Sequence, residues 1–157
     1  MSLSTKFLLI IFLNFLALKI YTIDIPKDLI VKVIKESENE DDIKSKSLDL
    51  ISVKYTGWIF DSNVPTNDPC DAKGKMFDSN ILDKFNHTSP FQFVLGKGIV
   101  IKGWDQGLQD MRINEHRCLV IPAHLAYGNR RIGNIIKPNS TLIFEVKLLK
   151  ILKVEKQ

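Results

Sequence analysis

Residues 94–111 read V-L-G-K-G-I-V-I-K-G-W-D-Q-G-L-Q-D-M, and the architecture depends on this stretch. Within it, Trp104, Leu108 and Met111 recur at i, i+4 and i+7. That spacing places all three on one face of a helix of about two to three turns. No other segment after residue 28 has a convincing helical period. The sequence therefore predicts a sheet that closes over one short helix, with Trp104 near its start.

The rest of the chain alternates between apolar and polar residues, which is typical of strands. The predicted strands are residues 25–35, 48–60, 76–79, 91–95, 117–121 and 141–151. Turn-rich loops are expected at 61–75 and 123–138, and one helical turn among Ile81, Leu82 and Phe85. Gly57 interrupts its strand and indicates a bulge or a close backbone contact. Together these segments predict a single α+β domain with five or six strands and one helix.

Length and charge limit the classes of function. The 157 residues are enough for one domain with a real core. The formal net charge is +4, and residues 1–23 contribute two lysines and no acid, so the remainder carries 4 − 2 = +2. A domain with so little excess positive charge has no electrostatic support for a nucleic-acid partner.

The N-terminus resembles a secretory signal. The apolar run 7–18 follows Lys6, as an h-region follows a basic n-region. The run is short for a membrane span and contains Asn14. The sequence predicts a signal peptide at 1–23 and a domain at 24–157, with an uncleaved membrane anchor as the alternative. The predicted localisation is the secretory pathway, either in the lumen of the endoplasmic reticulum or secreted.

Two further patterns are interpreted on the expectation that the protein is secreted. Cys70 and Cys118 lie 48 positions apart and can form a disulfide in an oxidising compartment, with two free thiols as the alternative. Asn86 and Asn139 each begin an N-x-S/T triplet, the acceptor pattern for N-glycosylation.

The common catalytic and metal patterns are absent. His87, His116 and His124 form no H-x-x-x-H or H-E-x-x-H pattern, so we expect surface histidines and no metal. There is no G-x-S-x-G elbow, and the G-K-G at 96–98 lacks the other positions of a phosphate-binding loop. It is predicted to be a hairpin turn. No cofactor is expected.

Several aromatic residues are widely spaced along the chain. They are Tyr55, Phe77, Phe91, Trp104, Tyr127 and Phe144. Each alone would be assigned to the core. Together they predict a concave pocket with an aromatic floor and few polar groups, which is typical of a site for a small molecule or a short peptide.

Seven short blocks occur in a characteristic order. They are Y-T-G at 55–57, F-D-S at 77–79, P-F-x-F-x-L-G at 90–96, V-I-K-G-W-D-Q-G-L at 100–108, L-V-I-P at 119–122, A-Y-G at 126–128 and L-I-F-E-V-x-L-L at 142–149. This series resembles the FKBP-type peptidyl-prolyl cis-trans isomerases, the immunophilins that bind tacrolimus and rapamycin. The resemblance covers about residues 28–152 and, with the signal-like N-terminus, is greatest to secretory single-domain members. It implies a twisted antiparallel sheet of five or six strands wrapped around one short helix.

The resemblance also implies roles for particular residues. Trp104 would form the floor beneath a proline ring, and Asp78 would be a buried carboxylate that acts as a loop anchor or has a direct electrostatic role. The Tyr127 hydroxyl and the Ile101 N–H would hold carbonyls. The implied catalytic set is Tyr55, Phe77, Asp78, Trp104, Tyr127 and Phe144, and the implied substrate- and inhibitor-binding set is Phe91, Val100, Ile101, Ile132 and Ile136.

The chain departs from the family pattern near the site. The loop 61–75 and the segment 80–89 are longer than in small members. Many members carry an arginine after F-D-S that pairs with the aspartate; here Lys84 is the basic residue in that segment, and the partner of Asp78 is unassigned. Leu125 stands where an aromatic residue is common.

The implied function is acceleration of X-Pro bond rotation in client polypeptides, which assists folding in the secretory pathway. The implied partners are proline-containing polypeptides and macrolide inhibitors. The protein is expected to be a monomer, without a membrane association unless the N-terminal segment is uncleaved. The alternative is a catalytically weak FKBP-like module that binds a protein partner.

Overall fold

The computed structural model describes residues 22–38 and 43–152. Residues 1–21, nearly all of the predicted signal segment, lie outside the described residues. The strands are β1 (Ile30–Lys35), β2 (Leu50–Phe60), β3 (Lys73–Ser79), β4 (Phe91–Val94), β5 (His116–Ile121) and β6 (Leu142–Leu152). The helix α2 spans Lys102–Gly107, and the 3₁₀ turns are η1 (Pro69–Asp71), η2 (Asp83–Phe85) and η3 (Ala123–Leu125).

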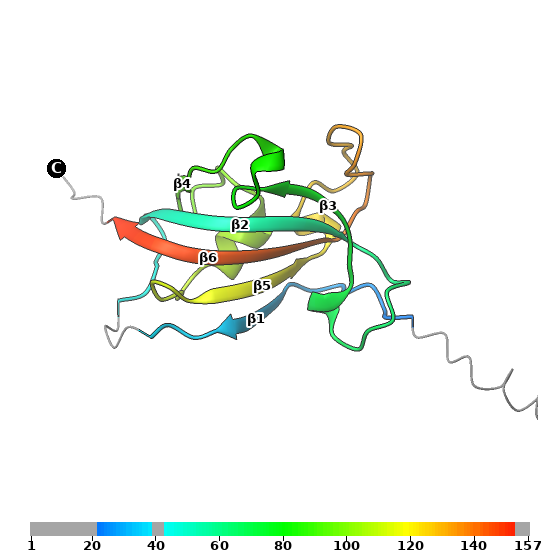
Figure 1. Cartoon of the computed structure of the whole chain (residues 1–157), viewed down its shortest axis with the longest axis horizontal. Coiled ribbons are helices and arrows are strands. Elements are labelled where there is room, and N and C mark those ends of the chain that lie inside the picture. Colours follow the sequence, from blue (N-terminus) through cyan, green and yellow to red (C-terminus); the bar gives the residue numbers. More distant parts are fainter. Residues whose placement is uncertain (1–21, 39–42, 153–157) are drawn as a thin grey trace, which may run out of the picture.

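The six strands form one antiparallel sheet, which confirms the predicted fold class (Figure 1). The strand order is β1-β5-β6-β2-β3, and β4 pairs with the first part of β2. β2 is therefore central: β6 lies on one side, and β3 and β4 share the other. β1 is an edge strand with largely exposed side chains, which explains its weak sequence pattern.

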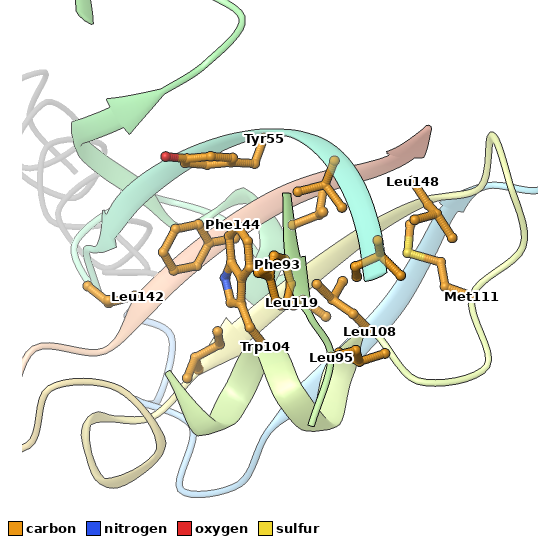
Figure 2. Packing of buried hydrophobic residues seen from close by; sticks show 14 of the residues in the cluster. Tyr55, Phe93, Leu95, Trp104, Leu108, Met111, Leu119, Leu142, Phe144 and Leu148 are labelled. Carbon is orange, nitrogen blue, oxygen red and sulfur yellow. The ribbon is translucent and has the colours of Figure 1, made fainter. Parts of the chain in front are cut away.

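The main core lies between the sheet and α2. Alternation along β5 sends Leu119 and Ile121 toward this core, while Cys118 and Val120 join a smaller cluster on the opposite face. Figure 2 shows Trp104 extending from the helix toward Tyr55 and Phe144 on the sheet. The helix thus supplies the residue around which the sheet's aromatic side chains gather.

The helix is shorter than predicted. Trp104, Leu108 and Met111 are all buried, as their period requires, but α2 ends at Gly107. Asp110 has φ 55°, a left-handed conformation that ends helical geometry. The buried Ser45 hydroxyl donates to the Leu108 carbonyl at 2.6 Å and accepts from the Met111 N–H at 3.0 Å. Ser45, which lies outside the helix, thus bonds backbone groups that a further helical turn would have paired. The spacing of apolar residues does not reveal such a partner.

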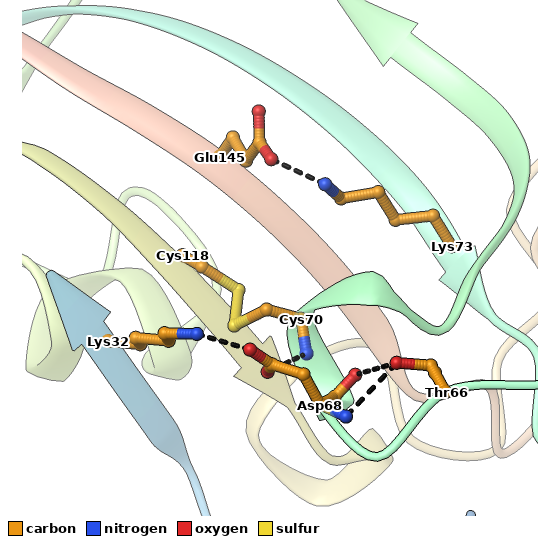
Figure 3. The surroundings of a disulfide bond; sticks show 7 residues. All are labelled: Lys32, Thr66, Asp68, Cys70, Lys73, Cys118 and Glu145. Carbon is orange, nitrogen blue, oxygen red and sulfur yellow. Dashed lines mark hydrogen bonds and ion pairs between the residues drawn. A yellow bond between two sulfur atoms is a disulfide. The ribbon is translucent and has the colours of Figure 1, made fainter. Parts of the chain in front are cut away.

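A disulfide joins the loop after β2 to β5. Cys70 on η1 and Cys118 on β5 are both buried, with their Cα atoms 6.1 Å apart (Figure 3). Asp68 caps η1 by accepting from the Cys70 N–H and pairs with Lys32 on β1. The predicted loop 61–75 is therefore partly ordered, and β3 begins at Lys73 rather than at residue 76.

Within the described ranges, 22–38 and 43–152, no helix has the length and apolar character that a bilayer span requires.

Candidate active site

A cavity of about 590 Å³ opens between the start of α2, the sheet and the segment after β5. This volume is in the range of roughly 300–1,000 Å³ that ligand pockets occupy. The structure brings together most of the residues implied above: Tyr55, Phe77, Asp78, Phe91, Val100, Ile101, Trp104, Tyr127 and Phe144 all line this cavity. The other lining residues are Gly98, Ile99, Lys102, His124, Ala126 and Arg130.

Two expected rim residues do not line the cavity. Ile132 and Ile136 pair with each other in an isolated bridge, and both of their backbone hydrogen bonds join these two residues. This small hairpin turns the side chain of Ile136 into the main core, where it is 5% exposed, and leaves Ile132 exposed. From the same loop, Arg130 lines the cavity instead.

Four aromatic rings surround Trp104. The ring of Tyr55 lies 5.1 Å away, those of Phe144 and Phe93 at 5.2 and 5.7 Å, and that of Phe91 at 6.1 Å. The contacts with Tyr55 and Phe144 are nearly perpendicular, an arrangement that aromatic quadrupoles favour. Among the described residues, the buried Trp104 Nε1 has no hydrogen-bond partner. The pocket floor is therefore built from packed aromatic rings.

Asp78 is the carboxylate of this pocket. One of its oxygens accepts a hydrogen bond of 2.7 Å from the Tyr55 hydroxyl, and the other contacts His87 Nε2 at 2.8 Å. The Asp78 side chain is 35% exposed, so the expectation of a buried carboxylate was wrong. Its position at the open mouth of the cavity explains the exposure. His87 is the partner that the sequence left unassigned.

Both tyrosines at the site are held in the neutral form. Burial, followed by the hydrogen bond to Asp78, raises the pKa of Tyr55. Burial, followed by the negative charge of Asp78, also raises the pKa of Tyr127. A neutral phenol is a hydrogen-bond donor, so the Tyr127 hydroxyl is able to donate to a carbonyl in the cavity.

The start of α2 is fixed by a carboxylate that the sequence analysis missed. Asp105 accepts hydrogen bonds from the N–H groups of Gly96 and Gly98, at 2.7 and 2.9 Å. Both glycines have positive φ, which favours glycine and forms a turn. This turn leads from β4 into α2 rather than into a second strand, so the predicted hairpin was wrong. The Ile101 carbonyl then accepts from the Trp104 N–H. A glycine turn followed by an acid in the first helical turn is the signal that predicts this contact.

Gly57 lets three strands meet beneath the pocket. It lies opposite Asp78 on β3 and opposite Phe144 on β6. A Cβ at this position would lie 2.7 Å from Phe77 Cζ and 2.8 Å from Phe144 Cε1. The close approach predicted for this glycine is confirmed, and its role is to leave room for two pocket rings.

Replacing Gly57 with alanine is expected to displace those rings. Overpacking of this kind costs about 1–3 kcal/mol of unfolding free energy. A displaced catalytic wall also lowers kcat/KM, here by roughly tenfold. Urea unfolding and a peptide isomerisation assay measure the two effects. The double variant Gly57→Ala/Phe77→Leu, which makes room for the new methyl group, should regain stability; no recovery would contradict a steric origin.

The described residues contain no cluster of histidine, cysteine and acidic side chains that could hold a metal ion. The cavity lining offers aromatic surface, the paired carboxylate of Asp78 and the hydroxyl of Tyr127.

Comparison with known proteins agrees with this geometry. The family model described as FKBP-type peptidyl-prolyl cis-trans isomerase matches residues 41–149. FK506-binding protein 2B of Rhizopus delemar is 46% identical over 108 residues, which are 69% of this chain and 44% of that protein. FK506-binding protein 1A of Neurospora crassa is 52% identical over 85 residues, 54% of this chain and 68% of that protein.

FK506-binding protein 2 of Kluyveromyces lactis is 42% identical over 124 residues, 79% of this chain and 77% of that protein. The chain thus spans less than half of the Rhizopus relative and about three quarters of the Kluyveromyces relative. The matched region of the family model contains every residue that lines the cavity. The chain belongs to the FKBP-type peptidyl-prolyl cis-trans isomerase family.

Proposed function

We propose that this protein accelerates cis-trans isomerisation of X-Pro bonds in client polypeptides. One observation carries the proposal: an aromatic floor around Trp104 lies in the same cavity as the hydroxyl of Tyr127, a hydrogen-bond donor. In this proposal a proline ring lies on Trp104, and the Tyr127 hydroxyl and the Ile101 N–H hold the flanking carbonyls; the presence of all three residues in the cavity lining supports it.

The reaction needs little more than this surface. Rotation about an X-Pro bond crosses a barrier of about 18–20 kcal/mol because it breaks amide resonance. The planar amide is more charge-separated than the twisted one, so an apolar cavity favours the twisted state relative to water. Asp78 is already paired with Tyr55 and His87, which favours its role as an anchor for the pocket wall over direct contact with the amide.

The same cavity is proposed to bind macrolides of the tacrolimus and rapamycin type. Several relatives carry the name FK506-binding protein. The residues that would contact such a ligand are those proposed to contact the proline, so the drug and the peptide should compete.

A matched pair of tryptophan variants tests the enzyme. The purified protein should accelerate isomerisation of a Leu-Pro tetrapeptide, and rapamycin should abolish the acceleration. Trp104→Leu should lower kcat/KM by roughly tenfold or more, since each 1.4 kcal/mol of lost transition-state binding is a factor of about ten. Trp58→Leu, on the opposite face of the sheet with the second cluster, should retain activity. Drug binding by a folded protein without acceleration would instead support the binding-module alternative.

We also propose that the protein acts in the secretory pathway, in the lumen of the endoplasmic reticulum or outside the cell. The apolar run 7–18 and the buried Cys70–Cys118 disulfide support this location. Asn86 and Asn139 both lie on exposed positions, where a glycan can be attached. Expression of the full chain in eukaryotic cells tests the proposal: a shift in electrophoretic mobility on glycosidase treatment is expected, and an unglycosylated cytosolic product would contradict it.

A further inference from the structure

The segment between β3 and β4 is longer than the connection needs and lies beside the cavity. It contains η2, and at its end Asn86 has φ 58° and donates its N–H to the Asp83 carbonyl at 2.9 Å. This left-handed residue ends the 3₁₀ turn, and the chain then reaches His87. The imidazole of His87 contacts Asp78 across nine positions of sequence.

The base of this segment is closed by buried polar contacts. The side chain of Asn80 is fully buried and donates to the Ser89 carbonyl at 3.1 Å and to the Val53 carbonyl at 3.0 Å. Its own oxygen accepts from the Tyr55 N–H at 2.7 Å. Lys54 Nζ donates to the carbonyls of Asn80 and Thr88. The two ends of the segment are therefore joined to β2, and His87 lies next to one of these contacts.

A chain of contacts runs from His87 to the pocket floor. His87 contacts Asp78, Asp78 accepts from the Tyr55 hydroxyl, and the Tyr55 ring packs on Trp104 at 5.1 Å. One Asp78 oxygen thus accepts from Tyr55 in the pocket wall, and the other contacts His87 in the segment 80–90. Without His87, the carboxylate would keep a single partner in the described structure and would be free to rotate about its own bond.

We propose that His87 is a positioning residue for the isomerase, which holds Asp78 and through it the ring of Tyr55, and that turnover follows the charge of the imidazole. The inference rests on the proposed function. A protonated imidazole forms a charge-assisted hydrogen bond to the carboxylate, which is about twice as strong as a neutral one. A histidine is the side chain that changes charge near neutral pH.

The direction of the pH dependence of kcat/KM follows from the contact between His87 and Asp78. The contact with Asp78 is stronger when the imidazole carries its proton, so kcat/KM should be higher in acidic than in alkaline solution. It should fall as the imidazole loses that proton. Because the His87 side chain is 46% exposed and solvent screens the pair, the expected fall is about two- to fivefold.

Other ionisable groups lie near the pair or in the same cavity. They are Lys54, Asp83, Lys84, Lys102, His124, Arg130 and the two tyrosines, whose pKa values are raised by burial. His124 is the other histidine of the cavity lining, so it needs its own variant.

The experiment is the pH profile of kcat/KM on a blocked Leu-Pro peptide for the full chain and four variants. His87→Gln should give a flat profile near the wild-type value at high pH, and His87→Arg, which keeps a permanent charge, a flat profile near the low-pH value. Both variants preserve the N-x-T triplet, so glycosylation at Asn86 is unchanged. His124→Gln should retain the inflection, as should His116→Gln on β5. A wild-type inflection that persists in His87→Gln would overturn the proposal.

A second measurement separates this proposal from the proposed function. The NMR resonance of the His87 Nε2 nitrogen should move when Asp78 is replaced by Asn, because the 2.8 Å contact with the carboxylate is lost. This result is independent of catalysis. A moved resonance in an inactive protein would retain the contact and reject the enzyme; an unmoved resonance in an active protein would reject the contact and retain the enzyme.

Discussion

Loss of the Cys70–Cys118 disulfide is expected to lower the free energy of unfolding by about 4 kcal/mol. The bond closes a loop with a sequence separation of 48, and the chain-entropy relation for a loop of this size yields about that value at 25 °C. Chemical unfolding of the oxidised protein, the reduced protein and the double variant Cys70→Ala/Cys118→Ala measures the difference. The oxidised protein should be the most stable of the three.

The control for this prediction is the reductant itself, which should leave the double variant unaffected. Activity supplies a second control. Cys118 belongs to the small cluster on the face of the sheet opposite α2, whereas Trp104 and Tyr55 belong to the main core. The reduced protein should therefore keep its kcat/KM at temperatures where it remains folded. A stability difference below about 1 kcal/mol would show that the bond constrains little of the unfolded chain.

The sheet could be predicted from the sequence because its signal is local. A period of two marks β2 and β6 directly, and both strands begin and end within two residues of their predicted limits. The weak period at 25–35 likewise yielded an edge strand with little burial. Gly57 could be interpreted correctly because a glycine inside a strong strand often marks a bulge or a close approach of another group to the backbone.

The pocket could be predicted only in part. The aromatic residues were found because each occurs in a block that resembles the family, and the structure places them around one cavity. Ile132 and Ile136 do not line the cavity, and their pairing within a loop is not visible as a period. The partner of Asp78 was missed because His87 reaches it through an irregular segment, where neither spacing nor resemblance provides a register.

The predicted end of the helix was wrong for a related reason. Burial at Leu108 and Met111 extends the helical period past Gly107, but hydrogen bonds decide where a helix ends. Those bonds come from Ser45 and Arg117, on either side of the helix in sequence. A pattern that detects a face cannot detect a capping group so far away.

Replacing Arg117 with methionine is expected to cost about 3–5 kcal/mol of unfolding free energy, because it leaves a buried partner without its charge pair. Arg117 is 9% exposed and pairs through Nε with Glu115, which is 2% exposed. Its Nη1 donates to the carbonyls of Gly107 and Gln109 at 2.9 and 2.7 Å, and its Nη2 to that of Asp110 at 2.9 Å.

Two further variants identify the cause. Arg131→Met, at an exposed position outside the cavity lining, should change stability by less than about 0.5 kcal/mol. The double variant Arg117→Met/Glu115→Gln removes the stranded charge and should recover at least about 1 kcal/mol of the loss. No recovery would assign the cost to the helix carbonyls instead. Arg117 donates to the Gly107 carbonyl of α2, and α2 carries Trp104. Its loss should therefore also lower kcat/KM at temperatures where the variant is still folded.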